Sequence, residues 1–64
     1  MKNKKIYKER ILKVLRDFGE IPTARISAIC GINYYSIIPL LEELRQEGKI
    51  ISNVSPVASY WRLK

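Results

Sequence analysis

Apolar side chains recur at helical spacing over the first part of the chain, the pattern of an amphipathic helix. From Lys4 to Phe18, one face collects Tyr7, Ile11, Val14, Leu15 and Phe18. Ile6 and Leu12 fall outside this stripe, so we expect them to meet something other than the core. Gly19 follows and favours a left-handed helix end. The pattern therefore predicts a helix over residues 4–18.

A second, shorter apolar pattern follows Pro22 and predicts a helix over residues 23–30. Thr23 stands where an N-cap residue is favoured. Ile26 and Ile29 are predicted to point inward. Cys30 falls on the same side of the helix, where it is expected to act as a small buried hydrophobic residue. The residue before a proline avoids the helical region. We therefore expect residues 20–22 to form a short extended link.

The third apolar pattern predicts a helix over residues 33–47, ended by Gly48. Its inward positions are Ile37, Leu40, Leu41 and Leu44. Pro39 lacks an N–H and disturbs the interior of a helix. Because Asn33 and Ser36 are both good caps, we expect a loose first turn from Asn33 and a regular helix from about Ser36.

The last part of the chain reads as a β-hairpin over residues 49–63. Two segments rich in β-branched and aromatic residues, "KIISNV" and "ASYWRLK", flank the turn Ser55-Pro56-Val57. Side chains alternate across a strand. We predict that Trp61 and Leu63 face the helices.

A short helix, a glycine turn and a second helix form a helix-turn-helix pattern. The segments "PTARISAICGINYYSIIPLLEELRQEGKI" and "SYWRL" resemble the winged helix-turn-helix domains of bacterial and archaeal transcriptional regulators. The resemblance covers the chain from about Lys8 onward, and small stand-alone examples occur in archaea and their viruses. It implies one α+β, mostly α, domain over residues 1–64, with three helices and a small antiparallel hairpin, the wing. It also implies DNA binding, with the third helix in the major groove.

Charge supports a polyanionic partner. The net charge is +6, the sequence pI is about 9.8, and residues 1–16 alone carry seven basic side chains against one acidic one. Such a basic segment is typical of nucleic-acid binding. The resemblance, together with this charge, implies binding to double-stranded DNA with modest sequence dependence, as a transcriptional regulator.

Composition argues against other classes of function. The chain has no His and one Cys, which excludes an internal disulfide and the usual zinc ligand sets, and Cys30 has no histidine to activate it. We therefore expect no enzymatic activity, no metal and no cofactor. The longest apolar run is far shorter than the ~20 residues of a membrane span, and no signal peptide is recognisable. A cytoplasmic protein with no membrane partner is expected.

The resemblance and the charges together select candidate interface residues. The predicted DNA-binding residues are Lys2, Lys4, Lys5, Thr23, Arg25, Asn33, Tyr34, Tyr35, Ser36, Pro39, Asn53 and Ser55. Ile6 and Leu12 are candidate contacts in a homodimer, which would place two copies on half-sites about 10 base pairs apart.

Two departures from the family pattern leave an alternative open. No Lys or Arg lies between Asn33 and Leu44, so the Arg–guanine pair is missing there, and the wing segment "SNVSPVAS" carries no basic residue either. Glu42 and Glu43 are neighbours on the predicted helix and point in different directions, so we interpret them as part of a solvent-exposed face. An apolar wing tip and an outward face containing Tyr35 and Ile38 fit instead a protein–protein interaction module.

Overall fold

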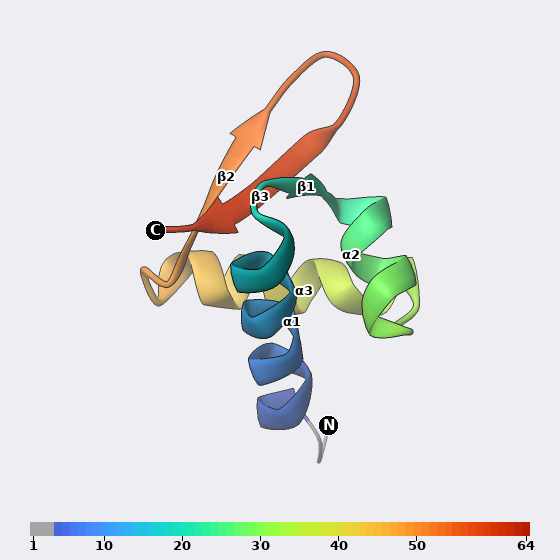
Figure 1. Ribbon diagram of the computed structural model, residues 1–64, viewed down its shortest axis with the longest axis vertical. Helices are drawn as coiled ribbons and strands as arrows, with labels where there is room; N and C mark the ends of the chain where they lie inside the picture. The colour runs from blue at the N-terminus through green and yellow to red at the C-terminus, as the bar shows by residue number, and fades with distance from the viewer. Residues whose placement is uncertain (1–3) are drawn as a thin grey trace.

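The computed structural model describes residues 4–64 and contains three helices and a three-stranded antiparallel sheet. The elements are α1 (Lys4–Phe18), β1 (Ile21–Pro22), α2 (Thr23–Cys30), α3 (Tyr34–Gln46), β2 (Ile50–Val54) and β3 (Ser59–Leu63). Helix α1 crosses α3, and α2 lies beside α1. The β2–β3 hairpin projects away from the helices (Figure 1). The predicted winged helix-turn-helix architecture is confirmed, with element boundaries within one or two residues of those expected.

The core lies where the three helices and the sheet meet. Its buried apolar residues are Ile11, Val14, Leu15, Ile26, Cys30, Ile32, Ile37, Leu40, Leu41, Leu44, Ile50 and Trp61. All four predicted inward residues of α3 belong to this set, and Tyr7, Leu12 and Leu63 pack against it while partly buried. The helical periodicities therefore identified most of the core.

Two apolar residues predicted to be inward are exposed. Phe18 is 53% exposed, because α1 ends at this residue and the chain turns away at Gly19. Ile29 is 37% exposed. The buried row of α2 contains Ile26 and Cys30, and Ile29 lies roughly a quarter turn from the centre of that row.

The turn between α2 and α3 is held by backbone and hydroxyl contacts. Gly31 has φ +69°, a left-handed conformation that glycine adopts without a steric penalty. The amides of Gly31 and Ile32 both donate to the carbonyl of Ser27, at 3.0 and 3.2 Å. The Ser27 hydroxyl donates in turn to the carbonyl of Ile32. These contacts fix the angle at which α3 leaves α2.

The sheet ties the start of α2 to the wing. β1 pairs with β3, which also pairs with β2, so β3 is the central strand. The prediction that Thr23 is an N-cap is wrong: Pro22 occupies that position, and Thr23 is a buried helical residue. Its hydroxyl donates to the Ser59 carbonyl at 3.3 Å and accepts from Trp61 Nε1 at 2.7 Å. Trp61 is buried and Leu63 partly buried, as predicted.

Helix α3 begins without the loose first turn that we expected. Asn33 is the N-cap, and its Oδ1 accepts from the Tyr35 amide at 2.9 Å. The amides of Ser36 and Ile37 both bond to the Asn33 carbonyl, so the helix is regular from Tyr34 onward. Pro39 therefore lies inside the helix, and the Tyr35 carbonyl has no N–H donor four residues on. In the same turn, the Asn33 side chain satisfies the Tyr35 amide.

Candidate nucleic-acid interface

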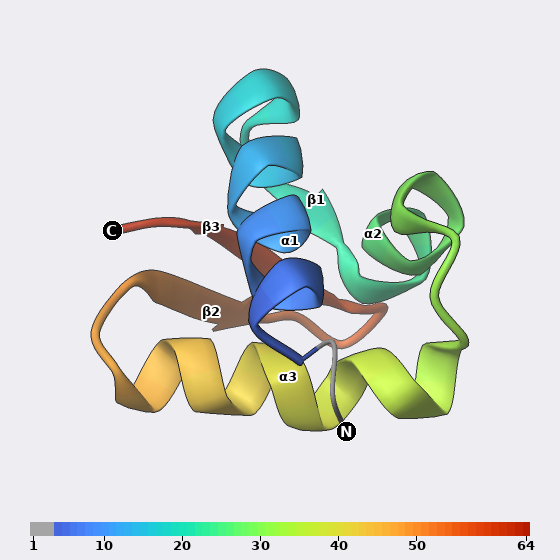
Figure 2. The same ribbon diagram turned by 90° about the horizontal axis from the view of Figure 1, so that it is seen from below.

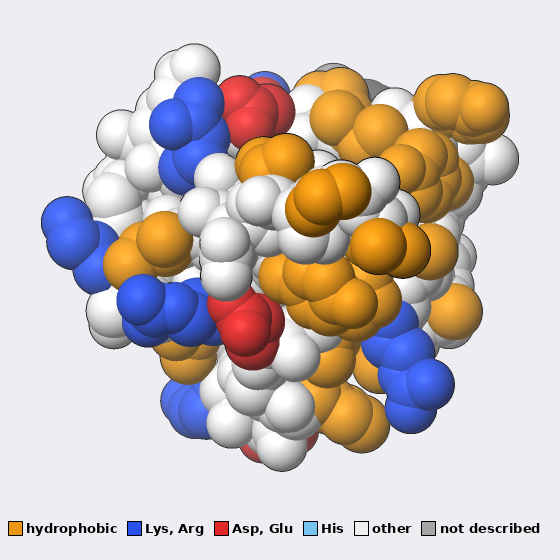
Figure 3. Space-filling model, turned by 90° about the horizontal axis from the view of Figure 1, so that it is seen from above, with side chains coloured by type: hydrophobic (Ala, Val, Ile, Leu, Met, Phe, Trp, Pro, Cys, Tyr) orange, Lys and Arg blue, Asp and Glu red, His pale blue; other side chains and the backbone are white. Residues whose placement is uncertain are grey.

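The outward face of α3 is apolar and aromatic over its N-terminal half. Tyr35 is 80% exposed, Tyr34 42% and Ile38 36%, and Pro39 is exposed as well. The rings of Tyr34 and Tyr35 pack edge to face, with centroids 5.5 Å apart and an interplanar angle of 86°. Hydrophobic side chains form a patch around and beside the hairpin, and basic side chains lie at its borders (Figure 3).

The N-terminal end of α1 lies beside this half of α3. Lys4, Ser36, Pro39, Leu40 and Glu43 line one hollow between the two helices. Figure 2 shows the start of α1 reaching the middle of α3. The fold thus brings together three residues predicted for DNA contact, one from α1 and two from α3.

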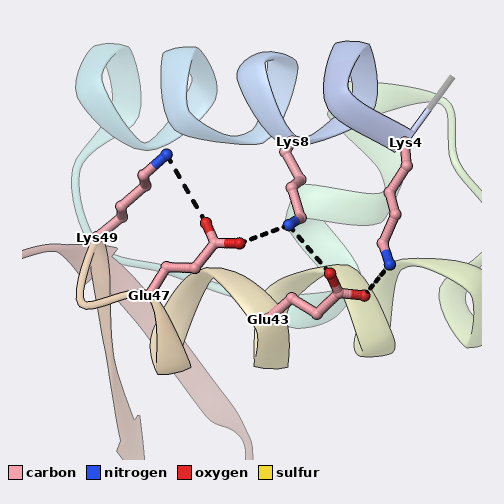
Figure 4. A network of polar contacts seen from close by, with 5 residues as sticks. All are labelled: Lys4, Lys8, Glu43, Glu47 and Lys49. Atoms are coloured by element: carbon pink, nitrogen blue, oxygen red, sulfur yellow. Dashed lines mark hydrogen bonds and ion pairs between the residues drawn. The ribbon is translucent and has the colours of Figure 1, made fainter.

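A chain of ion pairs crosses from α1 to α3 (Figure 4). Glu43 binds the ammonium groups of both Lys4 and Lys8, the latter at 3.0 Å. Glu47 lies 2.7 Å from Lys8 Nζ and 3.7 Å from that of Lys49. These five residues form the α1–α3 ion-pair chain. Two lysines of the basic segment are therefore already paired within the protein.

The ion-pair chain shifts the titration of its members. Hydrogen bonds from Lys4 and then Lys8 lower the pKa of Glu43, and the hydrogen bond from Lys8 lowers the pKa of Glu47. The hydrogen bonds to Glu47 and Glu43 raise the pKa of Lys8. Sequence reasoning missed these partners. The signal was a matched four-residue spacing, with two lysines on one face of α1 and two glutamates, Glu43 on α3 and Glu47 at its C-cap.

The one arginine of α3 is occupied by its own helix. Arg45 Nε and Nη2 donate to the two carboxylate oxygens of Glu42, at 3.1 and 2.9 Å. This pairing lowers the pKa of Glu42. Glu42 and Glu43 do point different ways, as predicted, and each holds a cation.

The remaining predicted contacts are dispersed over the molecule. Lys5, Arg25 and Asn53 are exposed on α1, α2 and β2. The Ser55 hydroxyl holds the wing turn, donating to the Ala58 carbonyl at 2.9 Å and accepting from the Ala58 amide at 3.1 Å. Lys2 lies outside the described residues.

Thr23 and Leu12 have roles inside the molecule. Thr23 is buried, and its hydroxyl is engaged by Trp61 and Ser59 within the molecule. The expectation that Leu12 meets something other than the core is wrong: Leu12 is partly buried, packs against the core and lines hollows on one side of α1. Ile6 is 54% exposed. Six helical positions separate these two by about 240° around the axis, so they lie on different sides of α1.

The groups that could carry other chemistry are few. Cys30 is buried, and this burial raises the pKa of its thiol. Within residues 4–64, no three His, Cys, Asp or Glu side chains come together as a metal-ligand set. Over the same residues no single helix is long and apolar enough to cross a membrane, and α2 and α3 pass that test only as a pair bent by 109°.

Searches by sequence find neither a matching protein family nor a matching curated protein. Solved structures do match. The Zα domain of Carassius auratus PKZ, solved in complex with Z-DNA, superposes with a TM-score of 0.90 at 16% identity, over 95% of this chain and 97% of that one. The transcriptional regulator PA4135 matches with a TM-score of 0.85 at 21% identity, over 91% of this chain. ZitR of Lactococcus lactis matches with 0.84 at 21% identity, over 98% of this chain.

The chain covers 45% of PA4135 and 49% of ZitR, about half of each, but nearly all of the Zα domain. At these identities the likeness concerns the backbone arrangement. The helix order, the sheet order β1-β3-β2 and the projecting hairpin agree with it. The chain has the winged helix-turn-helix fold.

Proposed function

We propose that the protein binds duplex DNA and acts as a transcriptional regulator. The N-terminal half of α3 enters the major groove, and the wing lies along the backbone. The observation that carries this proposal is the match over nearly the full length of both chains to a domain solved with Z-DNA. The net charge of +6 on 64 residues supports it independently.

Phosphate contacts come from the edges of this face. Lys4 and Lys5 lie at the start of α1, next to α3, and Lys2 precedes them in the sequence. Arg25 is exposed on α2, the helix that crosses the DNA backbone in helix-turn-helix complexes. Asn53 is exposed on β2 of the wing. Such contacts supply affinity and position the reading helix, but they carry no sequence information.

A salt titration of duplex binding tests the proposal. Fluorescence anisotropy is measured with a right-handed mixed-sequence duplex and with a CG-repeat duplex held in the left-handed form. Each neutralised phosphate contributes about −0.9 to the slope of log affinity against log salt. We expect a slope steeper than about −2. No salt-dependent binding to either form would refute the proposal.

Two triple variants with the same loss of charge locate the phosphate contacts. Changing Lys2, Lys4 and Lys5 to alanine should weaken binding to all duplexes alike and flatten the slope. Changing Lys13, Arg16 and Lys64 to alanine removes three charges from the other end of α1 and the end of the chain. This control should bind nearly as the parent does. Equal effects would indicate unlocalised charge attraction.

A protein-interaction module is the second candidate. The observation that favours it is the exposed apolar wing, where Val54 is 75% and Val57 90% exposed. If this candidate is right, the lysine triple variant binds DNA no more weakly than the parent at low salt. Under that outcome, the surface to examine is the wing tip together with Tyr35 and Ile38.

A further inference from the structure

The reading half of α3 offers an unusual set of groups to a major groove. Tyr35, Ile38 and Pro39 are exposed, and none carries a cation or an amide side chain. The tyrosine ring is held by its edge-to-face contact with Tyr34. Pro39 fixes the local φ. This surface is mostly apolar, and its one side-chain polar group is the Tyr35 hydroxyl.

The amide, carboxylate and guanidinium groups at α3 that normally read bases are engaged or distant, and the hydroxyls of Tyr34, Tyr35 and Ser36 are the polar groups left on its reading half. The Asn33 side-chain oxygen caps the helix by accepting from the Tyr35 amide, which spoils its two-point pairing with adenine. Glu42 and Arg45 bind each other through two hydrogen bonds, so neither is free for cytosine or guanine. Gln46 is exposed, but it lies about 16 Å along the axis from Tyr35.

The exposed apolar groups of Tyr35, Ile38 and Pro39 match one feature of the major groove. Each base presents a distinct edge there, and thymine alone presents a C5-methyl group, which apolar side chains contact. We infer that Tyr35, Ile38 and Pro39 read thymine methyl groups, so that the protein prefers A·T-containing sites in right-handed DNA. This inference rests on the proposed function and names the chemical group that the site recognises.

A duplex lacking only the methyl groups tests the inference. Replacing thymidine by deoxyuridine in a bound A·T-rich duplex removes each C5-methyl and leaves every base-pairing group and phosphate in place. Burying one methyl-sized group corresponds to about a fourfold change in affinity. We therefore expect the all-deoxyuridine duplex to bind at least fourfold more weakly, with an unchanged salt slope.

A double-mutant cycle assigns the effect to residues. In the Ile38→Ala protein, the loss on replacing thymidine by deoxyuridine should be clearly smaller than in the parent, because one of the apolar partners of the methyl groups is missing. Tyr35→Phe retains the ring and removes the hydroxyl, so it should retain the full thymidine preference. Phe18→Ala, an exposed apolar residue at the end of α1 away from the proposed interface, is the control and should behave as the parent. Ile38 is partly exposed, so its truncation should leave the far-UV circular dichroism unchanged.

The failures of the two proposals are distinguishable. Salt-dependent binding with equal affinity for thymidine and deoxyuridine duplexes would overturn the methyl inference and leave DNA binding intact. A thymidine preference that persists fully in Ile38→Ala and disappears in Tyr35→Phe would also overturn it, because a hydroxyl hydrogen bond would then be responsible. Absence of binding to every duplex would overturn the proposed function itself.

Discussion

The buried hydroxyl of Thr23 makes a quantitative prediction about how the wing is attached. It joins α2 to β3 by accepting from Trp61 Nε1 at 2.7 Å and donating to the carbonyl of Ser59. Both Thr23 and Trp61 are 6% exposed, so water cannot readily replace the hydroxyl. Thr23→Val preserves the shape of the side chain and removes only its hydrogen-bonding group.

The expected cost follows from the group left without a partner. A buried N–H that loses its acceptor costs about 1–3 kcal/mol. In a domain of this size, each kcal/mol lowers the melting temperature by about 4–8 °C. Thr23→Val should therefore melt about 5–20 °C below the parent. Trp61 is the single tryptophan, so its fluorescence and the far-UV circular dichroism should report one coincident transition.

Thr23→Ser is the matched control, because it retains the hydroxyl and removes a methyl group. It should lie between the parent and Thr23→Val in melting temperature. If the valine variant melts at or above the serine variant, the hydroxyl bridge does not stabilise the fold and the reasoning fails. The wing would then be held by apolar packing of the tryptophan ring alone.

Three further predictions concern charge and assembly. Glu43→Gln should tighten DNA binding roughly two- to fivefold at low salt, since it frees Lys4 and removes a charge that repels phosphate. Glu42→Gln, whose partner Arg45 is on its own helix, is the comparison, and an equal gain there would refute this role. Because the pKa of Glu43 and of Glu47 is lowered in the folded state, their ion pairs stabilise the protein at neutral pH and are lost as the pH falls through those lowered values. Between about pH 5 and pH 2.5, the melting temperature should fall less in a variant with both glutamates changed to glutamine than in the parent. Equal falls in melting temperature would contradict the assignment. Sedimentation equilibrium at high micromolar concentration should show a homodimer that Ile6→Lys returns to monomer; a monomeric parent, with and without DNA, would exclude the dimer.

The sequence by itself determined the fold class and the element order. The apolar spacing on three segments, the glycines that end them and the alternation around Trp61 are local signals, and local geometry alone interprets them. Gly31 and Gly48 have the positive φ values that such helix ends require. Most of the core and the inward direction of Trp61 followed from the same periodicities.

The sequence was less informative where a side chain's role depends on a distant partner. Threonine is a residue type favoured at helix N-caps. Here the pairing of β1 with β3 brings Trp61 to the Thr23 hydroxyl, so Thr23 is instead a buried residue that joins α2 to β3. The loose turn predicted before Pro39 does not form, because the Asn33 cap and core packing at Ile37 hold the helix regular. In each case, a contact made by the whole fold outweighed a residue's local preference.

Only the tertiary structure decided which charges and faces are available to a ligand. The sequence suggests that the lysines of α1 are free to bind a ligand. The crossing of α1 over α3 instead places Lys4 and Lys8 against Glu43, which is 35 or more residues away in the sequence. The same crossing sets the start of α1 beside Ser36 and Pro39. The net charge of a segment can be counted from its sequence. Which charges form ion pairs depends on the distances between helices, and these distances are determined only by the packing of the core.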